Sequence, residues 1–163
     1  YVQGGMIAYT GIWGAYIPVI DQVRDTLDLL HVQLYNNGGL PNPYMLGAAP
    51  EGSVDMMVAS AKMLVEGFKL ADGTQFAPLR DDQVAIGLPS GPSSANSGQA
   101  PVQNIYDALD CLIKGTKCST VVPAKLYPSF GGVRTGSINW DNHDAFNFSL
   151  PVVNNQNKLH AGQ

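Results

Sequence analysis

Residues 29–36, Leu-Leu-His-Val-Gln-Leu-Tyr-Asn, decide the fold class. Apolar and polar residues alternate here at the period of two that a β-strand imposes. One side of the strand carries Leu30, Val32 and Leu34, and the other carries His31, Gln33 and Tyr35. In a parallel sheet, one side packs on helices and the other faces a barrel interior or a second layer. The polar and aromatic side predicts a ligand site near the C-terminal end of the strand. A buried strand whose polar groups satisfy one another explains the pattern equally well.

The rest of the chain alternates between two periodicities. Apolar stripes at spacings of three and four residues predict three helices: over 17–30, from the N-cap Ser53, and from Pro101 to Gly115. Strands are predicted over residues 29–35, 83–90 and 133–140. This order is typical of an α/β protein with right-handed crossovers between parallel strands. We expect residues 1–152 to form one unit and residues 153–163 a polar, flexible tail.

Composition excludes several classes of protein. The 163 residues carry a net charge of -4, and only 13% of them are charged. The absence of a Lys/Arg cluster argues against nucleic acid as a partner. No apolar run approaches the roughly 20 residues that span a bilayer, and the first residues lack the pattern of a signal peptide. The chain begins with Tyr1 instead of Met, which suggests a larger or processed product.

Cys111 and Cys118 are the two cysteines of the chain. Cys111 lies near the end of a predicted helix, and Gly115 allows the chain to turn back toward it. A loop of this length can reach disulfide geometry. Two unrelated buried thiols are the alternative. A disulfide would indicate an oxidising compartment, and hence secretion.

Few residue patterns indicate catalytic chemistry. There is no Gly-x-Ser-x-Gly elbow, and the three histidines lack metal-ligand spacing, so we expect neither a bound metal nor a cofactor. Residues 141–144 predict a capped turn or the start of a helix. The remaining candidates are neutral amides and aromatic rings: Tyr9, Trp13, Gln33, Tyr35, Asn36 and Trp140. Such groups suit an uncharged, amphipathic ligand, and sugars fit that description.

Four blocks of sequence together resemble the family 18 glycoside hydrolases, the chitinases, and particularly their secreted bacterial members. The blocks are Tyr-Val-Gln-Gly-Gly at 1–5, Val-Gln-Leu-Tyr-Asn at 32–36, Val-Ala-Ile-Gly-Leu-Pro at 84–89, and Gly-Gly-Val at 131–133 followed by Ser-Ile-Asn-Trp-Asp at 137–141. The resemblance implies a (β/α)8 barrel that hydrolyses β-1,4-linked N-acetylglucosamine polymers. It also implies that this chain is the C-terminal half of a TIM barrel, with parallel strands six to eight and their helices.

The resemblance further assigns site residues. Family chemistry is substrate-assisted: a glutamic acid protonates the leaving oxygen while the acetamido oxygen of the substrate attacks the anomeric carbon. Tyr35 would orient that acetamide as a catalytic residue, and Gln33 and Asn36 would line the same sugar subsite. No Asp-x-x-Asp-x-Asp-x-Glu run, which carries the family's acid, occurs in this sequence. Gly136 stands where the family has a tryptophan that forms the floor of the cleavage subsite, and Arg134 stands where it has Met.

Two functions remain open from the sequence. One is a fragment of a secreted chitinase, inactive alone, that seeks its missing N-terminal half or another copy of itself. The other is a non-catalytic, chitinase-like module that binds chitin or chitooligosaccharides.

Overall fold

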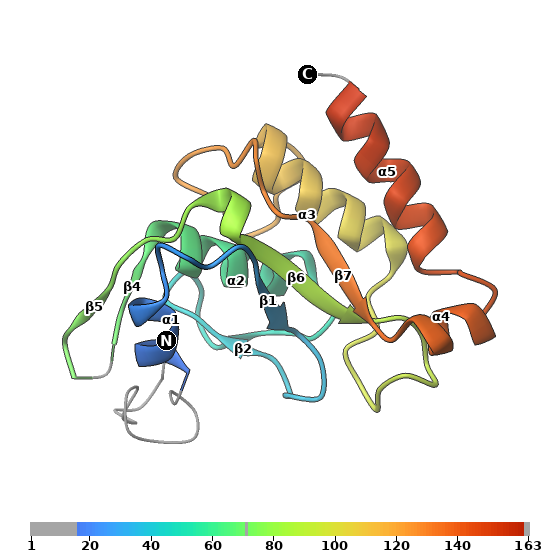
Figure 1. Cartoon of the computed structure of the whole chain (residues 1–163), viewed down its shortest axis with the longest axis horizontal. Helices are drawn as coiled ribbons and strands as arrows, with labels where there is room; N and C mark the ends of the chain where they lie inside the picture. Colours follow the sequence, from blue (N-terminus) through green and yellow to red (C-terminus); the bar gives the residue numbers. More distant parts are fainter. Residues whose placement is uncertain (1–15, 71, 162–163) are drawn as a thin grey trace.

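The computed structural model describes residues 16–70 and 72–161, and its centre is a parallel sheet of three strands in the order β1-β6-β7 (Figure 1). The strands are β1 (Leu30–Gln33), β6 (Val84–Pro89) and β7 (Val133–Gly136). Both pairings are parallel. The α/β class and the parallel arrangement predicted from the sequence are therefore confirmed.

The register of the sheet decides which residues share a side. Gln33 pairs with Gly87, and Gly87 pairs with Arg134. Laterally paired residues point to the same side of a sheet, so these three form one row. One strand step away, Val32 pairs with Ile86, whose side chain is 1% exposed. The two sides of the sheet therefore differ as the strand pattern predicts: one side is apolar and covered, and the other is polar.

Helices α2 (Val54–Glu66) and α3 (Val102–Lys114) cover the apolar side, and α2 contacts both α3 and β6 (Figure 1). Helix α2 begins at Ser53, whose hydroxyl accepts a hydrogen bond from the N–H of Met56, as the predicted N-cap should. Helix α3 ends at Gly115, whose left-handed conformation with φ of 72° suits glycine. Both helices confirm the predicted boundaries because their caps are local features.

The predicted first helix and third strand are shorter than expected. Helix α1 (Ile17–Gln22) ends before the apolar stripe does, and the following turn is held by buried Gln83, which donates to the carbonyls of Arg24 and Leu27. The strand predicted over residues 133–140 ends at Gly136. Helix α4 (Ile138–His143) replaces its second half. The helix start predicted at residues 141–144 is therefore wrong, because the helix begins at Ile138 and these residues lie at its end.

Residues 149–161 form helix α5 (Ser149–Ala161), which packs beside α3 (Figure 1). The boundary that the sequence placed after Val152 thus lies inside a helix, and residues 153–161 have a helical backbone. Val152 and Leu159, seven residues apart, are 2% and 3% exposed. Two widely spaced apolar residues are enough to hold this polar helix against its neighbours, although they give a weak periodic signal.

The remaining elements are short. They are the antiparallel pair β2 (Leu40–Pro41) and β3 (Ala48–Ala49), the antiparallel pair β4 (Phe68–Lys69) and β5 (Gln75–Phe76), and the 3-10 turn η2 (Asp81–Gln83). In the part of the chain that the structure describes, no helix is both long enough and apolar enough to cross a membrane.

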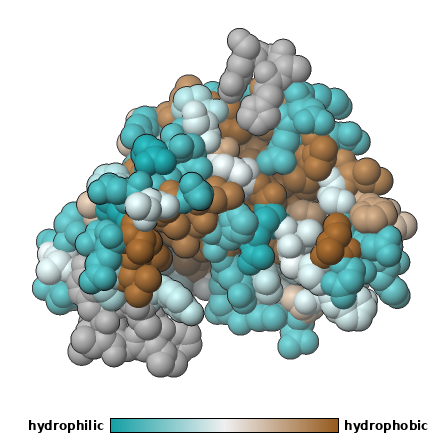
Figure 2. Space-filling model, in the orientation of Figure 1, coloured by the Kyte–Doolittle hydropathy of each residue, from teal (hydrophilic) through white to brown (hydrophobic). Residues whose placement is uncertain are grey.

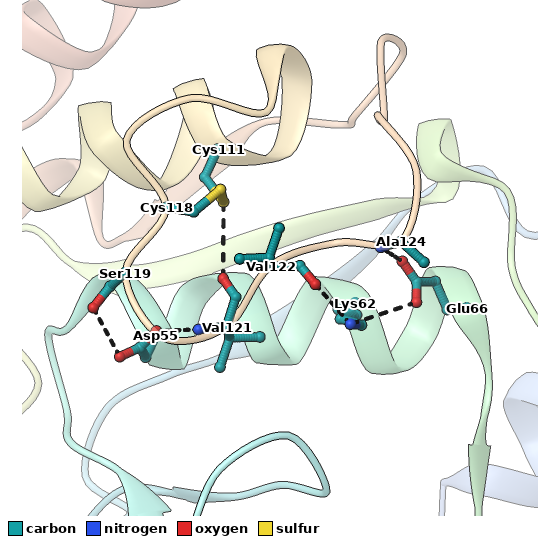
Figure 3. Close-up of a disulfide and its surroundings, with 9 residues drawn as sticks. All are labelled: Asp55, Lys62, Glu66, Cys111, Cys118, Ser119, Val121, Val122 and Ala124. Carbon is teal, nitrogen blue, oxygen red and sulfur yellow. Dashed lines mark hydrogen bonds and ion pairs between the residues drawn. A yellow bond between two sulfur atoms is a disulfide. The ribbon is translucent and has the colours of Figure 1, made fainter.

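The predicted disulfide is present between Cys111 and Cys118 and closes the start of the loop that connects α3 to β7 (Figure 3). The same loop is held along α2 by hydrogen bonds from its backbone (Figure 3). Asp55 accepts from the N–H of Val121 at 2.7 Å, and Glu66 accepts from the N–H of Ala124 at 2.7 Å. An 18-residue connection without regular structure, residues 115–132, is therefore fixed by side chains of a helix and by a covalent link.

Candidate active site

The C-terminal ends of the three parallel strands meet at one edge of the sheet, and Tyr35 lies there. A Cβ atom added to Gly136 would stand 3.1 Å from the Tyr35 hydroxyl oxygen, so the phenol reaches from the end of β1 to the end of β7. A Cβ atom added to Gly98 would lie 2.4 Å from the Cβ of Tyr35. The two glycines leave the space that the Tyr35 side chain occupies. The structure thus brings together Tyr35 and Gly136, two residues that the sequence had linked to one subsite.

The other two predicted sugar-binding residues lie near Tyr35 but differ in their contacts. Gln33 is exposed, and its side-chain amide donates to the carbonyl of Tyr35 at 3.2 Å. Asn36 bonds to the loop after β6: its side-chain oxygen accepts from the N–H of Ser97 at 3.1 Å. Asn36 therefore links two loops at the edge of the sheet, a role that its position in the sequence did not reveal.

Glu51 is a further member of this edge that the sequence reasoning missed. Its carboxylate accepts hydrogen bonds from the N–H groups of Asn37 at 2.7 Å and Gly38 at 3.1 Å. An interaction with the Ser97 hydroxyl, followed by the bond from Asn37, lowers the pKa of Glu51. Glu51 thus fastens the two loops that flank Tyr35. No sequence signal marks it, because its partners are backbone groups of distant loops.

We expect the fastening by Glu51 to weaken in acid. The pKa of its carboxyl is lower in the folded chain than the ordinary value of 4.5 for a glutamate. The stabilisation that the ionised Glu51 carboxylate gives to the folded chain is therefore fully present above pH 4.5. It is lost as the pH falls through the lower pKa that Glu51 has in the folded chain. NMR shifts of the Asn37 and Gly38 amides should titrate below pH 4.5, and Glu51→Gln should remove this titration. A midpoint at or above 4.5 in the unaltered chain would contradict the account.

Trp140 lies on α4, directly after the end of β7, and 40% of its surface is exposed. Its ring meets that of His143 edge-on at 5.7 Å, and His143 pairs with Asp144. Asp141 is fully buried and accepts from the N–H groups of Phe148 and Ser149, so it caps the start of α5. The other aromatic candidates, Tyr9 and Trp13, lie outside the described residues.

A pocket of about 310 Å³ lies elsewhere, between α1, the edge strand β1 and α2. Its lining is almost entirely apolar: Tyr16, Ile20, Leu30, His31, Val32, Leu40, Ser60, Met63, Leu64 and Phe68. None of the three predicted sugar-site residues lines it. Figure 2 shows hydrophobic surface in the middle of this side of the molecule, between hydrophilic margins. An apolar pocket beside a strand edge that pairs with no further strand among the described residues suits contact with another polypeptide segment more than with a sugar.

Apart from the Glu51 carboxylate, whose hydrogen bonds go to the Asn37 and Gly38 N–H groups, the groups described at the edge that holds Tyr35 are neutral. Among the described residues, no group of three His, Cys, Asp or Glu side chains comes together as metal ligands would. A phenol, amides and backbone groups can orient a polar ligand through hydrogen bonds.

Parallel strands that place such groups at their C-terminal ends, with helices on the opposite side, are typical of a section of a (β/α)8 barrel. No family model matches the sequence. Chitinase Chi52 of Paenibacillus xylanexedens is 42% identical over 154 residues, which cover 91% of this chain and 29% of that protein. Chitinase D of Niallia circulans is 42% identical over 162 residues, covering 94% and 31%.

A solved structure gives the same relationship. The family GH18 chitinase from Chromobacterium violaceum matches with a TM-score of 0.89 and 54% sequence identity, covering 95% of this chain and 42% of that one. The chain belongs to the family 18 glycoside hydrolases and corresponds to the C-terminal half of their catalytic barrel. It spans about three tenths of the length of the two curated relatives.

Proposed function

We propose that this chain is the part of a chitinase that orients the acetamido group of the substrate, while the proton donor comes from polypeptide outside the chain. The observation that carries this proposal is the position of Tyr35. Its hydroxyl lies at the C-terminal edge of the sheet, beside Gly136, where barrel enzymes place their active sites. The chitinases to which the chain is similar supply the expected substrate, β-1,4-linked N-acetylglucosamine polymers.

Tyr35 acts on the acetamide in this proposal. A phenol donates one hydrogen bond, and its ring can lie against the apolar face of a sugar. Held in place, the acetamide oxygen attacks the anomeric carbon and takes the role that a carboxylate nucleophile has in other retaining glycosidases. Gln33 and Asn36 border the same subsite. Asn36 contributes mainly by holding the loop at Ser97 over the end of β1.

The general acid belongs to the remaining part of the barrel. The thirteen Asp and Glu residues of the chain include no Asp-x-x-Asp-x-Asp-x-Glu run. Proton donation in the transition state contributes about 100-fold to 10,000-fold to rates. The chain alone is therefore inactive, and it acts after association with the rest of the barrel, which meets it at the open edge of β1 and the apolar pocket beside that edge.

Secretion follows from the substrate and the disulfide. Chitin is an insoluble polymer that an enzyme must meet outside the cell. The bond between Cys111 and Cys118 persists in an oxidising environment. We propose an extracellular location for these reasons.

The proposal is tested by joining this chain to the N-terminal portion of the Chromobacterium violaceum chitinase; we refer to the product as the joined polypeptide. We expect the joined polypeptide to release oligosaccharides from acetylated chitin and to leave fully deacetylated polymer intact, because the reaction needs the acetamide. Equal hydrolysis of both polymers would contradict substrate assistance.

A non-catalytic chitin-binding module is the second candidate, and Trp140, exposed on α4, favours it because sugar-binding surfaces use exposed rings. A pull-down of the isolated chain on chitin separates the two functions. Retention of the chain, together with an inactive joined polypeptide, would favour the binding module. Activity of the joined polypeptide would favour the enzyme.

A further inference from the structure

Arg134 places an uncompensated positive charge on the polar side of the sheet. It is half-buried on β7 and shares a row with Gly87 and Gln33. A Cβ atom added to Gly87 would lie 3.3 Å from the guanidinium Nε, so the side chain lies over the bare backbone of β6. The Nε atom is buried and has no hydrogen-bond partner among the described residues.

No carboxylate side chain of the described residues neutralises this charge. All thirteen Asp and Glu residues of the chain lie in the part that the structure describes, and none pairs with Arg134 within 4.0 Å. The neighbours of Arg134 on the polar side are neutral or basic: Gln33, Gly87 and His31. Burial lowers the pKa of His31, and the positive charge of Arg134 lowers it further. The imidazole and the guanidinium are therefore close enough to interact electrostatically. A half-buried guanidinium with an unpaired N–H is costly unless an acceptor faces it.

We propose that Arg134 is the docking anchor for an acidic side chain on the part of the barrel outside this chain, with which it forms an ion pair inside the closed barrel. Charge complementarity points to a carboxylate, because a guanidinium offers several donors in a planar fork that matches two carboxylate oxygens. The chain spans 42% or less of the three relatives compared above, so the partner surface has ample room to carry that acid. The inference rests on the proposed function only in taking the chain as one part of a barrel.

The test compares one substitution in two proteins, the chain alone and the joined polypeptide, by urea unfolding. Arg134→Met keeps an unbranched side chain about as long as the aliphatic part of Arg and removes the charge. In the chain alone we expect an unchanged or higher urea midpoint, because an unpaired charge is removed. In the joined polypeptide we expect a midpoint lower by about 1 M, because the acid is left buried without its partner.

The matched control is Arg80→Met. Arg80 is exposed and pairs with Asp82 within the chain, so its loss should change both midpoints slightly and equally. Equal shifts of both proteins by Arg134→Met would overturn the inference. If the chain alone unfolds without a cooperative transition, the test uses the joined polypeptide only. There, Arg134→Lys should lower the urea midpoint less than Arg134→Met does, because Lys keeps the positive charge. Equal decreases would show that Arg134 only fills space.

The result of the unfolding experiment can be distinguished from the result of the activity experiment. A joined polypeptide without chitinase activity whose midpoint still falls with Arg134→Met would refute the proposed function and support the ion pair. An active joined polypeptide whose urea midpoint does not change with Arg134→Met would support the proposed function and refute the ion pair.

Discussion

Tyr35→Phe should lower kcat of the joined polypeptide about 100-fold to 1,000-fold, the usual effect of removing one hydrogen-bond donor from a group on which charge develops. The substitution deletes the hydroxyl alone. The ring keeps its contacts with the loop at Gly98 and with the neighbouring strand ends. KM should change much less than kcat, because the hydroxyl acts mainly in the transition state.

The control for this experiment is Tyr106→Phe. The Tyr106 hydroxyl donates to the carbonyl of Pro151 on α5, which lies on the helical side of the sheet. Its removal should leave kcat unchanged within about twofold. Equal kcat values for the Tyr35→Phe variant and the unaltered joined polypeptide would remove Tyr35 from the chemistry.

Asp55→Ala should lower the free energy of unfolding by about 3 kcal/mol, through the loss of two hydrogen bonds to a buried carboxylate. Asp55 is 9% exposed and accepts from the N–H of Val121 at 2.7 Å and from the Ser119 hydroxyl at 3.1 Å (Figure 3). Val121 is 1% exposed, so water cannot reach its N–H once the carboxylate is gone without opening the loop. Urea or thermal unfolding measures the change.

Asp72→Ala is a matched control for that experiment. Asp72 also accepts from one backbone N–H and one hydroxyl, both of Thr74, but in an exposed turn. Water replaces both bonds there, so we expect no measurable change in the free energy of unfolding. Similar decreases in the free energy of unfolding for the two variants would mean that burial of the hydrogen bonds to Asp55 adds nothing to stability.

Sequence patterns predicted the elements whose signals are local. The strand at residues 30–33 shows its alternation directly, and Ser53 and Gly115 mark helix ends because caps are chosen by short-range hydrogen bonds and backbone conformation. The disulfide was predictable from the spacing of Cys111 and Cys118 and the glycine between them.

Elements fixed by distant contacts were harder to predict. The apolar stripe after Gln22 suggested a longer first helix, but Gln83 captures the carbonyls of Arg24 and Leu27 from 56 and more residues away. The helical backbone after Val152 depends on contacts with α3, and the weak stripe of α5 gave no sign of them.

The residues of the candidate site likewise fall into those that the sequence predicted and those that depend on distant contacts. The strand pattern and the family resemblance led to Tyr35, Gln33 and Asn36. The proximity of Tyr35 to Gly136 depends on the register of β1, β6 and β7, which the sequence does not encode locally. The sugar-binding roles of the three residues remain proposals. Glu51 was missed because its partners are backbone N–H groups, which every sequence offers.

The most direct test of the account is the rate of chitooligosaccharide hydrolysis by this chain alone, measured beside the joined polypeptide at equal concentration. Because the acid lies outside the chain, we predict a rate at least about 100-fold below that of the joined polypeptide. A purified chain that hydrolyses the oligosaccharides as fast as the joined polypeptide would show that it carries its own proton donor, in contradiction of the account.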